Sequence, residues 1–208
     1  MSLNAATYLS HLRPYVNNEY VIHDGTPKEV VLEEPYFVEN DAKERTRQVR
    51  LVLPGMGMAF KLDQDTFPSM TKTNGKKAKK PALFHFLDDT AMRWSRRCDF
   101  VVFYTNKRRL CADCIEFKSK SLNSHKIVPQ LEAGVCWVRS LKHIVEHHTG
   151  DRQRIHLRKF VFSSNEDPRN YIDDNHQLNA DPSIRFYHYD EVAGATIPEL
   201  ENASTQTL

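Results

Sequence analysis

The chain has 208 residues, 40% of them hydrophobic and 27% charged, with 29 lysines and arginines against 27 acids. These proportions fit one globular domain and exclude a disordered tail protein. No segment approaches the ~20 apolar residues of a membrane helix. Residues 1–30 lack the basic-then-apolar order of a signal peptide. We therefore expect a cytoplasmic protein with no membrane partner. The seven glycines form neither phosphate-binding glycine motif, which argues against Walker-type ATPases and dinucleotide enzymes.

The first eighty residues are expected to form an N-terminal elaboration of the domain. Helical spacing of apolar residues predicts a helix over 3–13 that ends at Pro14. Two β-rich runs follow, at 29–32 and 48–53, with the polar run 39–47 between them. Residues 54–80 are rich in proline, glycine and lysine and predict a long loop or insertion that includes a basic loop at 72–80.

The middle of the chain, residues 81–190, has the clearest pattern and is expected to be the core. Residues 98–105 and 110–118 are β-rich and flank a polar turn, so they predict a hairpin. Pro129 suits a first helical position, and apolar residues then recur with helical spacing up to Gly150. The remaining expected elements are a helix at 83–94, strands at 155–163 and 184–189, a loop at 164–182, a C-terminal tail at 191–208 and a frayed end at 199–208.

The order hairpin, helix, strand predicts the fold class. Such a β-β-α-β unit calls for an α/β or α+β fold with a central mixed β-sheet and flanking helices. The long helix is expected to pack on one face of that sheet. The elaboration, core and tail together are expected to make one compact domain.

Charge is distributed unevenly, although the formal net charge is only +2. Residues 72–126 hold fourteen lysines and arginines and five acids, whereas acids outnumber basic residues in the rest of the chain. Such a localised excess indicates either a phosphate-facing surface or a solvated face without a partner. The lysine-rich loop just before the core favours nucleic acid as the partner. The candidate nucleic-acid-binding residues are Lys72, Lys76, Lys77, Lys79, Lys80, Lys120 and Lys126.

Three charged residues of the expected hairpin are the candidates for chemistry. Glu116 and Lys118 are two apart on a strand and project to the same face, ~6.6 Å apart. Asp99 begins the paired strand and should lie opposite Glu116 within a residue or two. Two carboxylates and an ammonium group would then meet at one edge of the sheet. Two such oxygen ligands suit Mg²⁺, which activates water and offsets charge at a phosphorus centre.

This arrangement resembles the PD-(D/E)xK nuclease superfamily, which includes many restriction endonucleases and archaeal Holliday-junction resolvases. The resemblance covers about residues 83–163 and implies a restriction-endonuclease-like core. It implies that Asp99 and Glu116 hold Mg²⁺ (or Mn²⁺) and that the Phe117 carbonyl adds a ligand. It also implies that Lys118 acts on the water and that Gln130, expected in the first turn of the helix, supports the site. The expected activity is metal-dependent hydrolysis of nucleic acid, DNA in preference to RNA.

The chain also departs from the family pattern. Cys98 replaces the proline that precedes the aspartate, and the upstream helical acid has only Asp88, Asp89 and Glu44 as candidates. The acid-x-Lys tripeptide itself is uninformative, because it also occurs at Asp41. A nuclease-like module that binds nucleic acid without cutting it is therefore the alternative function. A homodimer or a larger complex is compatible with either function.

Two further motifs have alternative explanations. His143, Glu146 and His147 match the H-x-x-E-H pattern of zinc peptidases, but histidines near a helix C-terminus are favoured by the helix dipole as well. Cys111 and Cys114 have metal-ligand spacing, which Cys98 and Cys136 would complete. A three-residue step on a strand places its ends on opposite faces, so buried, reduced thiols are the simpler expectation.

Overall fold

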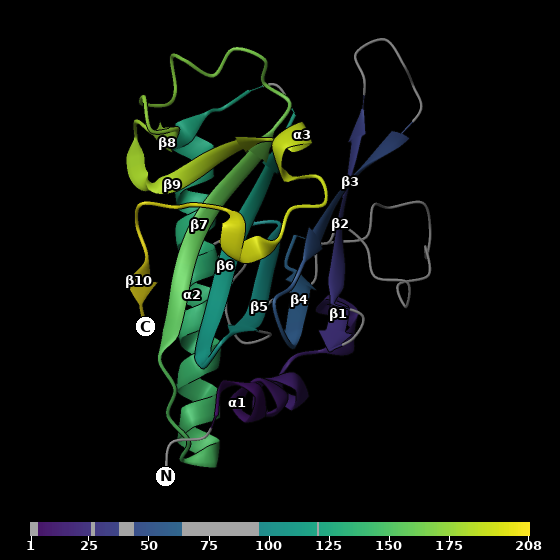
Figure 1. Cartoon of the computed structure of the whole chain (residues 1–208), viewed down its shortest axis with the longest axis vertical. Coiled ribbons are helices and arrows are strands. Elements are labelled where there is room, and N and C mark those ends of the chain that lie inside the picture. The colour runs from purple at the N-terminus through teal and green to yellow at the C-terminus, as the bar shows by residue number, and fades with distance from the viewer. Residues whose placement is uncertain (1–3, 26–27, 38–43, 64–95, 120) are drawn as a thin grey trace, which may run out of the picture.

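The computed structural model describes residues 4–25, 28–37, 44–63, 96–119 and 121–208. Its centre is an eight-stranded mixed sheet with flanking helices, an α/β fold (Figure 1). The strands of this sheet are β1 (Val21–Gly25), β4 (Gly57–Lys61), β5 (Phe100–Asn106), β6 (Arg109–Lys118), β7 (Ile155–Ser163), β8 (Gln177–Leu178), β9 (Asp181–His188) and β10 (Gln206–Thr207). A second sheet pairs β2 (Glu29–Phe37) with β3 (Glu44–Val52). The helices are α1 (Ala5–Leu12), α2 (Ser124–Thr149) and α3 (Tyr189–Val192), with short 3-10 turns η1 (Arg13–Tyr15), η2 (Asn18–Tyr20) and η4 (Ile197–Glu199).

The strand order is β1-β4-β5-β6-β7-β9-β8, with β10 also paired to β7. The β1–β4, β4–β5 and β5–β6 pairs are antiparallel, whereas β6–β7 and β7–β9 are parallel. The predicted hairpin is confirmed as β5 and β6, closed at Lys107 and Arg108, with Phe100 opposite Ile115. Lys107 has a φ of 56°, a left-handed conformation that tight hairpin turns require.

Apolar layers cover both faces of the central strands. Val101 and Ala112 face a layer built by α1 and α2, and Figure 1 shows α2 running behind β6 and β7. Phe100 and Ile115 face a second layer built by β2, β3, α3 and the C-terminal segment. Burial on both faces explains why β5 and β6 read as nearly continuous apolar runs rather than alternating ones. No helix within the described ranges is long and apolar enough to span a membrane.

Helix α2 begins earlier than predicted. It starts at Ser124 after the N-cap Asn123, so Pro129 lies inside the helix rather than at its first position. The amides of Lys126 and Ile127 both donate to the Asn123 carbonyl, at 3.0 and 3.1 Å. Ile127 in this extra turn is fully buried, and burial of its apolar side chain stabilises the helix. This stabilisation offsets the loss of the backbone hydrogen bond that Pro129 cannot donate. The helix ends at Gly150, as predicted, with a φ of 74°.

Strand β4 lies in a segment predicted to be a loop. Its burial is nearly complete on both faces, so it shows no alternation, and Gly57 weakens its β-propensity. A β-carbon at Gly57 would approach the Phe103 carbonyl oxygen to 2.8 Å, so the close approach of β4 to β5 requires glycine there. The prediction of a long loop or insertion over 54–80 was therefore wrong at Gly57–Lys61. The rest of that prediction from residue 64 onward, and the predicted helix at 83–94, lie outside the described residues.

The C-terminal segment is ordered rather than frayed. β10 pairs with β7, and the amides of Ile155 and Leu208 exchange hydrogen bonds with each other's carbonyls. Arg158 on β7 donates to the carbonyls of Ile197 and Leu200 and makes a two-bond ion pair with Asp113, at 2.7 and 2.9 Å. This arginine ties the segment to the sheet, which explains why sequence composition alone missed its order.

Candidate functional site

The candidate residues lie where β5 begins and β6 ends. The ladder pairs Phe100 with Ile115; Asp99 directly precedes β5, and Glu116 is the next residue of β6. Both side chains are buried, with relative exposures of 4% and 0%. The hairpin register therefore places the two carboxylates beside each other, as the sequence predicts. Residues of the same parity on these strands belong to the layer that α2 covers.

Reciprocal hydrogen bonds hold the two carboxylates. The amide of Asp99 donates to Glu116 Oε2 at 3.3 Å, and the amide of Phe117 donates to Asp99 Oδ2 at 2.5 Å. These bonds partly replace the hydration that the buried carboxylates lose.

Lys118 and Gln130 connect this pair to α2. Lys118 Nζ donates to Glu116 Oε1 and, at 3.3 Å, to Gln130 Oε1. Gln130 Nε2 donates to the Arg97 carbonyl at 3.3 Å, so both ends of its amide are engaged. Gln130 is the seventh residue of α2, not a first-turn residue as predicted. It nevertheless accepts a hydrogen bond from Lys118.

Electrostatics favour a cation at this site. Burial raises the pKa of Asp99 well above its usual range, and the charges of Glu116 and Glu34 raise it further. Burial also raises the pKa of Glu116, to about 7, although Lys118 opposes the shift. If both buried carboxylates were ionised, they would carry more negative charge than the single ammonium group of Lys118 offsets, and protonation is therefore favoured. A divalent cation would offset that charge and restore both groups to their ionised forms.

Two further acids approach the site and were missed in the sequence. Asp63 follows β4 and raises the pKa of Glu116, and Glu34 on β2 acts on Asp99. Glu34 forms an ion pair with Lys61 at 2.7 Å. The Leu62 amide donates to the Asp99 carbonyl at 2.8 Å, which brings the end of β4 alongside the site. Recognising β4 as the neighbour of β5 would have identified Asp63.

The donor set fits Mg²⁺ or Mn²⁺. These ions accept one or two protein carboxylates and take their remaining ligands from water and phosphate. Asp99 and Glu116 supply this pair. Within the described ranges, no group of three or more His, Cys, Asp or Glu side chains is arranged to hold a metal ion. The Phe117 ring packs on the opposite face against Phe100, so only its backbone belongs to the site.

The predicted nucleic-acid-binding lysines are mostly outside the described residues. Lys126 is exposed on the first turn of α2. The acids Asp88 and Asp89 also lie outside the described part of the chain, and Glu44 begins β3 with its side chain undescribed. The remaining undescribed candidates are Lys72, Lys76, Lys77, Lys79, Lys80 and Lys120.

The alternative metal motifs lack suitable geometry. Glu146 accepts a hydrogen bond from the Gln153 amide and pairs with Lys142 at 2.8 Å, while His143 and His147 stack on the exposed face of α2. Cys111 and Cys114 belong to opposite layers of the core. All four cysteines are free, and Cys136 is exposed. These residues do not form a zinc site.

Comparisons of the chain with protein-family models, with curated proteins and with solved structures find no match.

Proposed function

We propose that this protein is a Mg²⁺-dependent nuclease, also active with Mn²⁺, that hydrolyses phosphodiester bonds of nucleic acid. The observation that carries the proposal is the hydrogen-bonded cluster of two buried carboxylates, an ammonium group and an amide at one end of the β5–β6 hairpin. The residue types of this cluster, and their positions on two neighbouring strands and a following helix, resemble the pattern of the PD-(D/E)xK nuclease superfamily. The basic composition of residues 72–126 supports a polyanionic substrate.

Each residue of the cluster has a distinct role in this proposal. Asp99 and Glu116 would hold the ion, with Phe117 supplying a backbone carbonyl. A bound Mg²⁺ would lower the pKa of a water and offset negative charge at phosphorus. Lys118 Nζ is positioned to donate a hydrogen bond to the attacking water or to a phosphate oxygen. Gln130 orients Lys118 through its side-chain oxygen while its nitrogen is fixed by the Arg97 carbonyl.

Hydrolysis by this arrangement proceeds without a covalent enzyme intermediate. Cys98 lies near the two carboxylates, but its hydrogen bond with Cys114, its burial and the charges of Glu116 and Asp99 raise the pKa of its thiol and make it a poor nucleophile. The carboxylates and the lysine instead suit a water nucleophile. DNA is the favoured substrate, by the resemblance to restriction endonucleases. A homodimer, which would cut both strands of a duplex, and a cytoplasmic location remain predictions from the sequence.

One observation favours a second candidate function. Lys118 occupies Glu116 Oε1, and the described acids do not form a three-membered metal group. A nuclease-like module that binds nucleic acid without hydrolysing it would tolerate this arrangement. Such a module would retain salt-dependent binding in an Asp99→Ala variant and would show no turnover with any divalent metal.

Plasmid nicking tests both candidates. Purified protein with Mg²⁺ or Mn²⁺ should convert supercoiled DNA to open circles, and EDTA should abolish the reaction. Lys118→Met should slow nicking by about 100-fold, because it removes a donor that stabilises developing charge. Glu132→Gln, a change at an exposed residue of α2, is the matched control. Absence of turnover with both metals and with both DNA and RNA would refute the nuclease and favour the binding module.

A further inference from the structure

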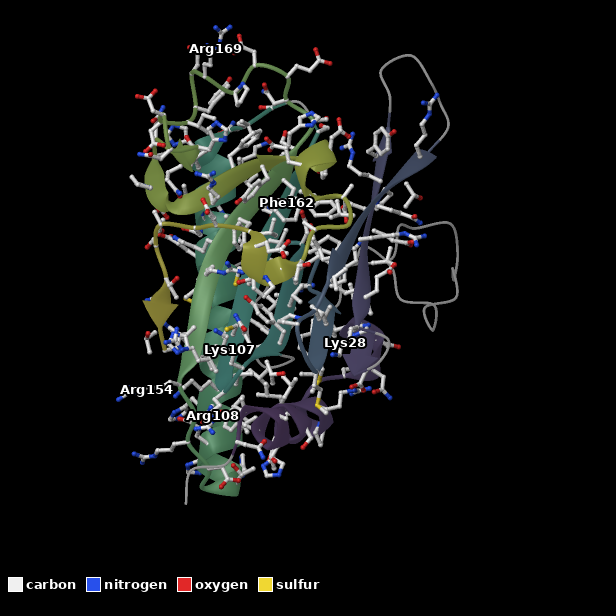
Figure 2. The ribbon with its side chains drawn as sticks, in the orientation of Figure 1. Lys28, Lys107, Arg108, Arg154, Phe162 and Arg169 are labelled. Carbon is white, nitrogen blue, oxygen red and sulfur yellow. The ribbon has the colours of Figure 1, made fainter. Side chains whose placement is uncertain are left out.

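A basic cavity lies at the opposite end of the sheet from the candidate site. Its volume is about 690 Å³, and its lining comes from the β5–β6 turn, the last turns of α2, the α2–β7 loop, His156 of β7 and Leu208 after β10. Figure 2 shows Arg108 and Arg154 together at this lower end, far from Phe162 near the upper end of β7. Arg109 begins β6 and Lys118 ends it, so nine residue-to-residue steps along the strand, roughly 30 Å, separate the cavity from the candidate site.

The cavity has a large excess of positive charge. Its lining contains Arg108, Arg109, Lys142, Arg152 and Arg154, against a single acidic side chain, Glu146. That glutamate is already engaged by Lys142 and by the Gln153 amide. The four arginines are exposed, and within the described ranges no carboxylate pairs with any of them. Elsewhere, Arg13, Arg50, Arg158 and Arg169 each have an acidic partner.

The helix dipole explains only part of this cluster. The negative end of α2 favours His147, which lies in the last turn of the helix. It does not account for Arg108 and Arg109, which the hairpin turn brings from a different element. His156 also lines the cavity. Burial is the main cause that lowers the pKa of His156, and the positive charges of Arg109 and Arg154 lower it further. Converging like charges are unfavourable unless an anion joins them.

The chemistry of the lining indicates the kind of anion. Guanidinium groups donate paired hydrogen bonds that match phosphate oxygens. Among the described lining residues, Leu208 is the one apolar side chain, and the rings are the polar imidazoles of His143, His147 and His156. Pockets for small ligands are lined mostly by apolar side chains, whereas a phosphodiester backbone needs only phosphate contacts. The open, polar cavity therefore suits successive backbone phosphates better than a small nucleotide.

We propose that this basic cavity is a second nucleic-acid-binding site, which holds the phosphate backbone through Arg108, Arg109, Arg152 and Arg154. Binding there is independent of base sequence. The site goes beyond the proposed nuclease centre, and it does not depend on hydrolysis at that centre. A strand held in the cavity would be anchored roughly 30 Å from the β5–β6 carboxylates, about nine base pairs of a duplex.

The test measures binding of a fluorescently labelled 20-base-pair duplex by anisotropy, in EDTA to prevent cleavage. The double variant Arg108→Ala/Arg154→Ala should weaken binding about tenfold near 0.1 M salt and should lower the slope of log K against log salt by about two. Arg108→Lys/Arg154→Lys should keep most of the affinity. Arg169→Ala is the control, because Arg169 is exposed at the other end of the molecule and pairs with Asp167.

Three results separate the possibilities. Equal affinity of the double alanine variant and the Arg169→Ala control would overturn the proposal. Tight stoichiometric binding of inorganic tripolyphosphate by calorimetry, lost in the double variant while duplex binding persists, would also overturn it and identify a small polyphosphate as ligand. Glu116→Gln should bind duplex like the original protein, so loss of nicking with binding intact separates the nuclease centre from this cavity.

Discussion

Glu116→Gln should stabilise the metal-free protein at about pH 8 while removing a proposed metal ligand. Glu116 is fully buried, and its pKa is raised from 4.5 to about 7, mainly by burial. Because the folded pKa exceeds the unfolded one, the folded state binds the proton more tightly. The free energy of unfolding therefore falls as the pH rises from about 4.5 to about 7. Above about pH 8, Glu116 is ionised in both states and the fall is complete. Glutamine has nearly the same shape as glutamate and is neutral, so it avoids the free-energy cost of burying an ionised carboxylate.

The size of the effect follows from the shift. A difference of about 2.5 pKa units corresponds to about 3 kcal/mol at 1.36 kcal/mol per unit. The raised pKa of Glu116 already reflects the opposing charge of Lys118, so no separate free energy is added for their ion pair. At about pH 4, where Glu116 is protonated in both states, the variant and the original protein should be nearly equal in stability.

Urea denaturation in EDTA at about pH 4, 6 and 8 measures this dependence. The stability difference between Glu116→Gln and the original protein should grow with pH, while the exposed control Glu132→Gln should change stability by less than about 0.5 kcal/mol throughout. Mg²⁺ should stabilise the original protein at pH 8 and have little effect on Glu116→Gln. A glutamine variant that is less stable at pH 8, or a difference that does not depend on pH, would refute the electrostatic reasoning.

Three other substitutions test the fold and the site. Arg158→Ala should lower the free energy of unfolding by about 3 to 5 kcal/mol, because it leaves Asp113 buried without its partner; a loss below 1 kcal/mol in denaturation experiments would contradict this. Gly134→Ala should destabilise by about 1 to 3 kcal/mol although alanine favours helices, because its β-carbon would overlap Cys98 Sγ; combining it with Cys98→Ala should restore stability, as thermal unfolding would show. Gln130→Ala should slow single-turnover cleavage about tenfold without changing DNA affinity, and an unchanged rate would remove its positioning role.

Local patterns in the sequence predicted the hairpin, the end of α2 and strand β7. Residues 98–118 combine two β-rich runs with a polar turn, so both the strands and the meeting of Asp99 with Glu116 follow from hairpin register. Gly150 ends α2 for a local reason, its left-handed conformation. These features depend on residues close in sequence, which is why sequence reasoning succeeded.

Long-range contacts determined the parts that were missed. β4 is stabilised by pairing with β1 and β5. Its sequence does not alternate between apolar and polar residues, so the sequence alone did not indicate a strand. β10 is ordered only because β7 offers an edge at its N-terminal end. Asp63 and Glu34 approach the candidate site through the positions of β4 and β2. None of these contacts leaves a periodic signal in the chain.

The rate of single-turnover cleavage of a labelled duplex by Glu116→Gln tests the central claim most directly. With Mg²⁺ and saturating protein, the account predicts a rate at least about 100-fold below that of the original protein, with DNA affinity unchanged. A variant that cleaves at the original rate would show that the β5–β6 carboxylates are not the catalytic centre.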